Sequence, residues 1–270
     1  MERSQKLKAT IFVLSYNHED TIETCLRSVF QNASDSDCEI IVHDDFSTDK
    51  SRDKIIEVMS SWKGQYKLVF PAYNRMGSGE EVFPDLIKEA NGEVIFVVDG
   101  DDFWTTTGSN RVEIMHAAVM QHPDVAMAFT DTLKINTLNQ QSQWMLKEPC
   151  KRDISSAELR KINYAYLHSG AACFRNVDVE FPEEFYGTTC QDIWYPMLWG
   201  AFGCAKYIED AGALIYRFNG QGVWSSCDAA ARVEKKAVFA QRILSYFARI
   251  GDQAAFHNNL WRLKAATSPA

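Results

Sequence analysis

The sequence contains no apolar run of the length that a transmembrane helix needs. Its longest uninterrupted apolar runs are Val94 to Val98 and Val125 to Phe129, about a quarter of the roughly 20 residues required. The run Ile11 to Leu14 is too short for the core of a signal peptide, and the residues before it are polar and basic. We therefore expect a cytoplasmic protein that carries no secretion signal.

The sequence also lacks the cysteine pattern of a zinc site or a disulfide scaffold. Its seven cysteines are an odd number and include no C-x-x-C pair. We interpret them as buried or idle thiols in a reducing compartment.

Positive charge is scarce in this chain. The 28 Lys and Arg residues against 36 Asp and Glu leave a formal net charge of -8, so the field of the whole molecule does not attract nucleic acid or an acidic bilayer. We expect no nucleic-acid partner, and an acidic partner must be held by local chemistry. The content of 46% hydrophobic and 24% charged residues is that of an ordinary globular protein and excludes disordered and collagen-like chains.

The first 130 residues alternate short apolar strands with helices, a pattern that predicts a mostly parallel sheet covered by helices on both faces. The predicted strands are Thr10–Leu14, Ile40–Val42, Lys67–Phe70 and Val94–Val98, and the predicted helices are Asp20–Phe30, Ile55–Met59, Val82–Ala90 and Arg111–Gln121. Ligands of such sheets bind at the carboxyl ends of the strands, and three polar clusters of this sequence follow strand ends.

The second half of the chain has a less regular pattern. We predict strands at Val125–Leu133 and Tyr164–Phe174, one or two strands within Lys206–Phe218, a helix at Ile193–Phe202, and a surface loop or flap at Asn136–Lys151. Helical spacing of apolar residues continues from Asp228 to Leu263. The simplest division is one domain over residues 1–227 with a helical tail over residues 228–270.

The sharpest chemical signal is Asp99-Gly100-Asp101-Asp102, directly after an apolar strand. Three carboxylates in four residues repel one another unless a cation or hydrogen-bond donors compensate them. Hard oxygen ligands of this kind suit Mg²⁺ or Mn²⁺. A solvated acidic turn is the alternative, but the strand before it and a second acidic strand end favour the metal site.

That second strand end contains Asp44, Asp45, Ser47, Thr48 and Asp49. A carboxylate here can accept the imide N–H of a uracil or a hydrogen bond from a ribose, and we expect Asp45 to bind ligand in this way. For the segment 47–49 we favour capping of the next helix.

These motifs resemble those of the family 2 inverting glycosyltransferases of GT-A fold. The matching segments are TIFVLSYN at residues 10–17, the helix at residues 25–30, IIVHDDFSTD at residues 40–49 and FVVDGDDFW at residues 96–104. The resemblance implies a nucleotide-sugar donor, a divalent metal on Asp99 and Asp101, and a nucleoside pocket built from Ser15, Tyr16, Asn17 and Asp45, with Asp99 also beside the donor. It divides the domain into a donor-binding part, residues 1–133, and an acceptor-binding part, residues 134–227. Leu14 replaces the usual Pro of the first motif, so no nucleobase contact is assigned there.

A second resemblance lies in the C-terminal half. QDIWYP at residues 191–196 resembles the start of the acceptor-site helix, which makes Asp192 the expected catalytic base. The segments AKYIED at residues 205–210 and IYRFNGQGVWS at residues 215–225 resemble a stretch of bacterial members that make surface polysaccharides. Asn219 stands where a His is usual, at a position that the resemblance associates with the metal or the diphosphate.

Other residues are weaker candidates. Arg75 could contact the diphosphate or the nucleobase, although a lone loop arginine is usually solvated. His168 lies near the predicted acceptor region, although a structural imidazole is the simpler interpretation. Three tryptophans, Trp194, Trp199 and Trp224, could stack on a sugar, with a core position as the alternative, above all for Trp199.

The sequence therefore predicts a metal-dependent enzyme that moves a hexose from a nucleotide-diphosphate sugar, with UDP as the expected nucleotide, to a hydroxyl of a glycan or lipid-linked oligosaccharide. One alternative is a sugar-1-phosphate nucleotidyltransferase, although the segment 15–19 has neither glycine nor net positive charge. Another is a catalytically idle sugar- or nucleotide-binding protein on the same scaffold. The tail is locally basic, with seven Lys and Arg between residues 231 and 264 against Glu234 and Asp252. It could contact an anionic membrane at the cytoplasmic face, or pack on the domain with a solvated basic face.

Overall fold

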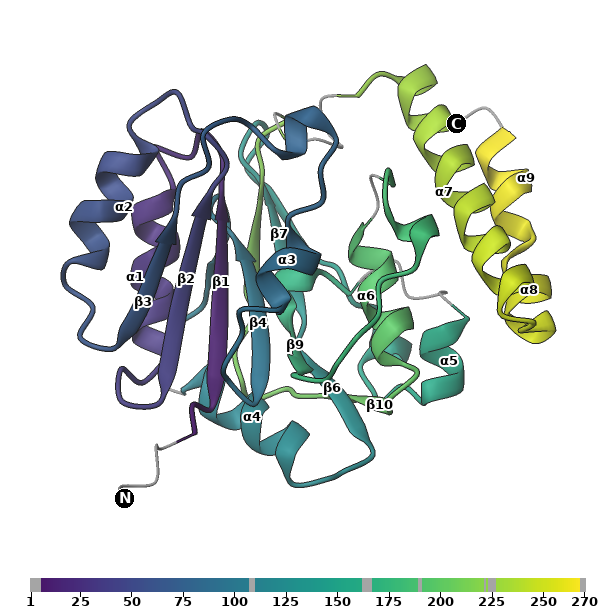
Figure 1. Ribbon diagram of the computed structural model, residues 1–270, viewed down its shortest axis with the longest axis horizontal. Coiled ribbons are helices and arrows are strands. Elements are labelled where there is room, and N and C mark those ends of the chain that lie inside the picture. Colours follow the sequence, from purple (N-terminus) through teal and green to yellow (C-terminus); the bar gives the residue numbers. More distant parts are fainter. Residues whose placement is uncertain are drawn as a thin grey trace.

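The computed structural model describes residues 6–106, 110–161, 167–188, 191–220, 222 and 227–267, without the side chains of residues 191, 192 and 265–267. Within these residues a seven-stranded sheet has the order β10-β6-β9-β4-β1-β2-β3, in which β9 is antiparallel to its neighbours and the other pairs are parallel (Figure 1). Its strands are β1 (Ala9–Ser15), β2 (Cys38–Asp44), β3 (Gln65–Val69), β4 (Val94–Asp99), β6 (Val125–Phe129), β9 (Ala172–Arg175) and β10 (Cys204–Tyr207). The predicted mostly parallel sheet is confirmed.

Helices cover both faces of this sheet because its strands are apolar on both sides. Val94, Phe96 and Val98 of β4 pack in one cluster, which includes buried residues of α1 (Ile22–Asn32), α2 (Ser51–Met59) and α4 (Arg111–Met120). Ile95 and Val97 pack on the opposite face with residues of α3 (Phe83–Ile87), α6 (Gln191–Trp199) and α7 (Ala229–Arg249). A short helix, α5 (Ser156–Arg160), lies beside α6 (Figure 1).

A second, smaller sheet was not expected from the sequence. Its strands are β5 (Phe103–Trp104), β11 (Leu214–Phe218), β7 (Thr132–Asn136) and β8 (Gln141–Trp144), in the order β5-β11-β7-β8. The single strand predicted over Val125–Leu133 is therefore wrong: the chain leaves the first sheet after β6 and enters the second sheet as β7. The segment 136–151 is not a simple loop, because β8 pairs with β7 as an antiparallel hairpin.

Buried Arg111 joins the two sheets at this transition. Its guanidinium donates to Thr130 Oγ1 and to the carbonyl oxygens of Ala171, Ala211 and Gly212, and it lies over the ring of Trp104. Burial lowers the pKa of Arg111 to about 10. Because a buried cation needs all of these acceptors, Arg111 fixes the segment before β11 against the end of β6 and the start of β9.

Two further predicted elements differ in extent. The strand predicted over Tyr164–Phe174 is reduced to β9, which follows a 3-10 helix at Ser169–Ala171, while residues 162–166 lie outside the described part. The predicted helix Val82–Ala90 is shorter in the structure, where α3 ends at Ile87.

The helical tail is confirmed, although it is broken into three helices. After α7 the chain turns at Gly251, whose φ of 74° lies in the left-handed region, and continues as α8 (Gln253–Asn259) and α9 (Trp261–Thr267). Phe239, Ile243 and Phe247 of α7 are buried in the core. Among the described helices we find none that combines the length and the apolar character required to cross a bilayer.

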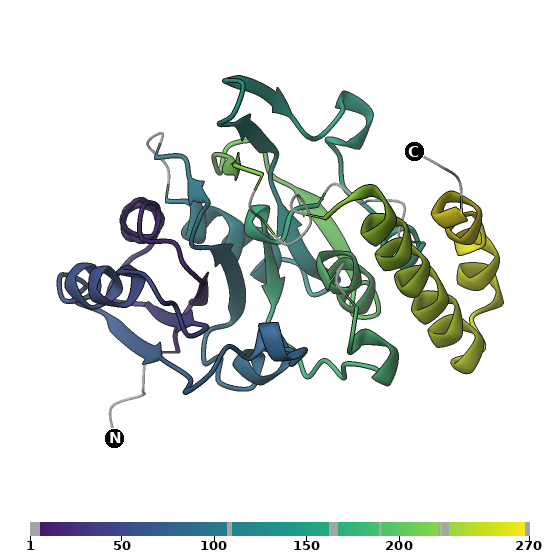
Figure 2. The ribbon, with the colours of Figure 1, turned by 90° about the horizontal axis from the view of Figure 1, so that it is seen from above.

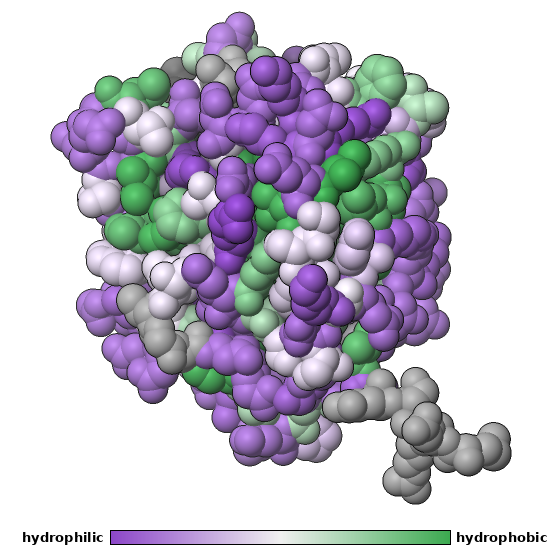
Figure 3. Space-filling view, turned by 90° about the vertical axis from the view of Figure 1, so that its left-hand side faces the viewer, coloured by the Kyte–Doolittle hydropathy of each residue, from purple (hydrophilic) through white to green (hydrophobic). Residues whose placement is uncertain are grey.

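The face of the molecule that carries α1, α2 and β3 is mainly hydrophilic and has only small, separate apolar patches (Figure 3). Ile56 and Tyr66 are among the exposed apolar residues of these elements. Scattered exposure of this kind is normal for a protein surface.

Candidate functional site

The three polar clusters predicted at strand ends do meet at one edge of the sheet. The strands β4, β1 and β2 are parallel neighbours, and their following loops are hydrogen-bonded to one another. The Thr48 N–H donates to Asn17 Oδ1 at 2.8 Å, and the Thr21 hydroxyl donates to the Gly100 carbonyl at 3.0 Å. The sequence prediction that these segments form one site is therefore consistent with the geometry.

The three residues of the first loop that were predicted to bind the nucleoside differ in burial and in hydrogen bonding. Ser15 is buried, and its Oγ has no hydrogen-bond partner among the described residues. Tyr16 is 44% exposed. Asn17 adopts a φ of 56°, a left-handed conformation that Asn tolerates better than most residues, and its side chain holds the second loop. Tyr16 is thus the side chain of the three that is most open to a ligand.

Of the segment 47–49, which was predicted to cap α2, only Asp49 bonds to the start of this helix. Ser47 donates to Asp44 and accepts from the Asn17 N–H, while α2 begins only at Ser51. Asp49 accepts from the N–H of Ser51 and from that of Glu19. These polar side chains join the two loops because each loop leaves backbone donors that need acceptors.

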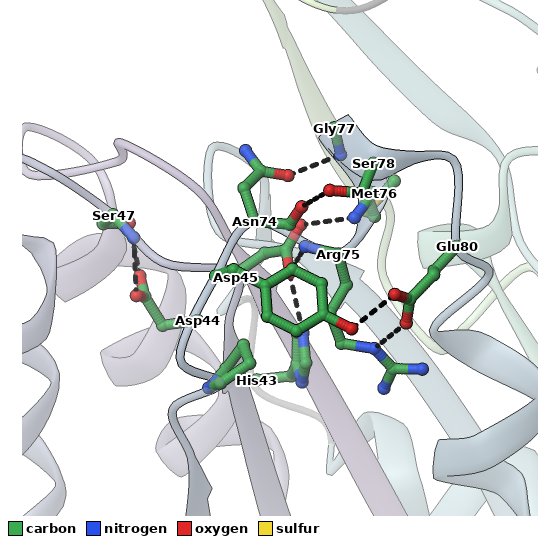
Figure 4. Close-up of polar contacts among 12 residues, drawn as sticks. His43, Asp44, Asp45, Ser47, Asn74, Arg75, Met76, Gly77, Ser78 and Glu80 are labelled. Carbon is green, nitrogen blue, oxygen red and sulfur yellow. Dashed lines mark hydrogen bonds and ion pairs between the residues drawn. The ribbon is translucent and has the colours of Figure 1, made fainter.

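Asp45 holds the loop that follows β3 (Figure 4). It is 2% exposed, and its two carboxylate oxygens accept the backbone N–H groups of Arg75 and Met76, each at 2.9 Å. His43 Nε2 lies 3.4 Å from Asp45 Oδ1. In this arrangement Asp45 positions the loop rather than facing solvent.

The side chain of Arg75 is also engaged within this loop. Its Nε donates to Glu80 at 2.9 Å, and its Nη2 donates to Asp85 at 2.8 Å. The hydrogen bonds that Arg75 donates to Asp85 and Glu80 raise its pKa above the ordinary value. The guanidinium is therefore neutralised by two carboxylates and does not lie free for a diphosphate.

The acidic turn Asp99–Asp102 lies at the end of β4. A Cβ at Gly100 would lie 2.7 Å from His18 Nδ1 and 3.1 Å from the Leu14 carbonyl, so only glycine fits between the loop and the turn. Asp101 is partly exposed, and its Oδ1 lies 4.0 Å from His18 Nε2. Asp102 is 1% exposed; its Oδ1 accepts the Arg217 N–H, while its Oδ2 has no hydrogen-bond partner among the described residues.

Among the described residues, the negative charge of Asp102 is poorly compensated. Burial, followed by the charges of Asp101 and Asp99, raises the pKa of Asp102 well above its ordinary value. The Arg217 guanidinium, whose pKa is lowered by burial, donates to the backbone oxygens of Asp101 and Thr21 rather than to a carboxylate. Asp102 Oδ2 is buried, has no hydrogen-bond partner among the described residues and lies beside two further carboxylates. Such an oxygen is chemically suited to bind a divalent cation.

His168 belongs to this site, a placement that the sequence did not indicate. Asp99, Asp102 and His168 form a group whose potential ligand atoms all lie within 4.8 Å of one another, and His168 Nε2 is 3.7 Å from Asp102 Oδ2. Asp101 is not part of this group of three. Neither His168 nor Arg217 carries a local sequence signal for this role beyond the position of Arg217 in the segment 215–225.

The acceptor-side predictions are only partly described. Asp192 is the second residue of α6, as predicted, but its side chain lies outside the described part. Pro196, four residues later, has no N–H to donate to the Asp192 carbonyl, so the helix is locally weakened there. Trp194 and Trp199 are fully buried core residues rather than sugar platforms, Trp224 lies outside the described residues, and Asn219 directly follows β11.

A family model described as glycosyl transferase family 2 matches residues 10–180. The chain belongs to this family. Among its relatives, a poly(ribitol-phosphate) beta-glucosyltransferase of Bacillus spizizenii is 40% identical over 36% of this chain and 15% of its own length. A UDP-Glc:alpha-D-GlcNAc-diphosphoundecaprenol beta-1,3-glucosyltransferase of Escherichia coli is 29% identical over 42% of this chain and 41% of its own length. The chain therefore spans less than half the length of these two relatives.

Solved structures of similar shape show the fold of this family 2 member. TarS 1-349 of S. aureus in complex with UDP-GlcNAc superposes with a TM-score of 0.60 at 19% identity, covering 97% of this chain and 82% of TarS 1-349. The mannosyltransferase PcManGT of Pyrobaculum calidifontis, in complex with GDP-Man and Mn²⁺, gives a TM-score of 0.55 at 16% identity over 97% of this chain and 74% of its own. The fold is GT-A.

Proposed function

We propose that this chain is a metal-dependent inverting glycosyltransferase that moves a hexose from a UDP-sugar to a hydroxyl of a glycan or lipid-linked oligosaccharide in surface polysaccharide synthesis. The observation that carries the proposal is the acidic turn Asp99–Asp102, located where the loops after β1 and β2 meet. This is the edge at which parallel sheets bind nucleotides. The turn contains the buried Asp102 Oδ2, which has no hydrogen-bond partner among the described residues. Family membership and the printed activities of the relatives support the same chemistry.

The loops after β1, β2 and β3 form the nucleoside side of the site. Tyr16 is exposed there and can stack on the base, while Ser15 and Asn17 shape the loop. Asp45 acts through the segment 75–76 that its carboxylate holds, and the side chain of Arg75 in this segment is paired with Glu80 and Asp85.

Asp99 and Asp101 are the residues that would hold Mn²⁺ or Mg²⁺ beside the diphosphate. A metal that shares its coordination shell with phosphates needs access to solvent, and the Asp101 side chain is 21% exposed, whereas Asp102 is almost fully buried. Asp102 and His168 then support the turn from inside, and Asn219, one residue beyond β11, is close in sequence to Arg217. A bound cation supplies neutralisation of the charge that develops on the leaving diphosphate.

Asp192 is the proposed base. The acceptor oxygen forms a bond to the anomeric carbon, the bond from that carbon to the diphosphate breaks, and the acceptor proton goes to the Asp192 carboxylate. A single displacement of this kind inverts the anomeric configuration. The position of Asp192 in the first turn of α6 favours its ionised form.

The donor-binding part, residues 1–133, and the acceptor-binding part, residues 134–227, share one scaffold in this proposal. The strands β9 and β10 of the second part belong to the same sheet as β1 and β4. The tail, residues 228–270, packs on the domain through α7 and is proposed to contact the membrane only peripherally.

The function is tested with Mn²⁺, UDP and a set of UDP-hexoses. We expect Mn²⁺-dependent release of UDP that EDTA abolishes; full activity in EDTA would exclude the metal, and no release from any donor would favour an idle binding protein. Asp101→Asn should weaken Mn²⁺ binding in the presence of UDP by a larger factor than His168→Gln does, because Asp101 is proposed to bind the cation directly and His168 only to support the turn. The opposite order would mean that the cation binds in the buried group of Asp99, Asp102 and His168.

A further inference from the structure

One face of the second sheet carries side chains that the donor site does not use. Across the sheet, Tyr216 of β11 is in register with Lys134 of β7, and Lys134 with Gln143 of β8. The next row on the same face contains Phe218, Asn136 and Gln141, because side chains two residues apart share a face. We call these six residues the Lys134 face; Gln141 and Gln143 are exposed and the other four are partly exposed.

The Lys134 face begins beside the acidic turn. The rings of Tyr216 and His168 lie 5.0 Å apart, and His168 lies against Asp102 and Asp99. From there the face extends across β7 to the β7–β8 hairpin, which lies at the upper edge of the molecule in Figure 2. A ligand on this face therefore starts next to the reacting end of the proposed donor site.

Lys134 is the cation of this face. Its Nζ lies 4.0 Å from the ring centroid of Phe218 and 5.8 Å from that of Tyr216. No described carboxylate lies within ion-pair distance of this ammonium, in contrast to Lys8, Lys67 and Lys151. The two rings hold the ammonium in place but do not neutralise it, since a cation–π contact leaves the charge available.

The neighbouring groups are those that recognise sugars. Aromatic rings such as Tyr216 and Phe218 can stack on the C–H face of a pyranose, and the Gln143 amide, which makes no side-chain hydrogen bond to a described residue, can bind hydroxyls. Because the net charge of -8 repels an anionic ligand at long range, an anionic acceptor needs a local cation of this kind. A neutral acceptor would leave the ammonium without a partner.

We propose that the Lys134 face binds the acceptor glycan and that Lys134 recognises an anionic group on it, either a phosphodiester or a carboxylate. The proposal rests on the proposed function, since it assigns the acceptor class of the same enzyme. An ammonium donates charge-assisted hydrogen bonds to both anions. The site itself therefore does not distinguish a phosphodiester from a carboxylate, and the choice of probes does.

The test measures binding of three probes of similar length to the full chain: a polyol-phosphate oligomer, an oligogalacturonate and a neutral maltooligosaccharide. We expect at least one anionic probe to bind about tenfold more tightly than the neutral one. Lys134→Met keeps the aliphatic stem on the two rings and should lose this preference without weakening UDP binding. The matched control is Lys63→Met, an exposed lysine far from this face in the chain, which should retain the preference.

A preference that survives in Lys134→Met, equal binding of anionic and neutral probes by the unchanged chain, or no binding of either anionic probe would each overturn the proposal. Phe218→Leu provides a second variant: it removes the ring that holds the ammonium and should also reduce the preference. Mn²⁺-dependent release of UDP is measured in parallel. If release occurs without an anionic preference, the acceptor assignment fails while the proposed function stands.

Discussion

Asp45→Asn isolates the role of the carboxylate that holds the segment 75–76. The substitution keeps the shape of a side chain that is 2% exposed but replaces one oxygen with an NH₂ group, which cannot accept a hydrogen bond. One of the two 2.9 Å bonds from Arg75 N–H and Met76 N–H is then lost. A hydrogen bond to a charged group contributes about 1.5–3 kcal/mol, which corresponds to about 10- to 150-fold in the opening equilibrium of this segment.

Amide hydrogen exchange at Arg75 and Met76 measures this opening directly. We expect exchange of both amides to accelerate by a factor in that range, because local opening is governed by the stability of the segment rather than of the whole domain. Asp85→Asn is the control, since it removes an exposed ion pair with Arg75 Nη2 that contributes at most about 1 kcal/mol. Unchanged protection of both amides in Asp45→Asn would refute the role of Asp45 as the anchor of this loop.

The same variant tests whether the loop forms part of the donor site. If the segment 75–76 closes over the base, the dissociation constant of UDP should rise with the loss of amide protection, because the binding-competent state is less populated. Faster exchange with unchanged UDP affinity would keep Asp45 as a structural anchor and remove the loop from the nucleoside pocket.

Three further predictions concern the base, the pH dependence of stability and the tail. Asp192→Asn should melt within a few degrees of the unchanged chain and bind UDP normally, yet transfer sugar at least about a hundredfold more slowly; transfer within about threefold would direct the search to Glu209 or Asp210. Burial lowers the pKa of His43 in the folded chain. As the pH falls below about 6.5, His43 is therefore protonated in the unfolded chain before it is protonated in the folded chain, and the free energy of unfolding decreases. Urea unfolding at several pH values should show a smaller decline in His43→Gln, and an identical decline would contradict the assignment. Replacing exposed Lys236 and Lys264 of the tail with Glu should reduce co-sedimentation with anionic vesicles, and equal sedimentation would argue against a membrane contact.

The tail also illustrates how packing limits an interpretation made from charge alone. Arg249 donates to Glu184 at 2.8 and 2.7 Å, and Arg262 is 9% exposed and lies over the rings of Phe239 and Trp261. Two of the seven basic residues counted in the sequence are thus engaged within the protein. The exposed Lys236 and Lys264 are the basic side chains with which the membrane contact is tested.

The sequence by itself determined the alternation of strands and helices and the edge at which the site lies. Short apolar runs such as Val94–Val98 favour a strand that is buried on both faces. The polar residues that follow β1, β2 and β4 come to one edge of the sheet because parallel neighbours end together. Local pattern also fixed the start of α6 near Asp192 and the helical character of the tail.

Only the tertiary structure decided which distant residues complete the site. The exposed strand β8 has three polar residues followed by Trp144, so no alternation of apolar and polar residues marks it, and it exists because β7 supplies backbone partners. Likewise, nothing local to Lys134 or Tyr216 places these residues together; the register of β11 against β7 does so. The ring contact between Tyr216 and His168 also joins segments that are distant in the chain. Strand register depends on pairings between distant segments, and local propensity does not contain that information.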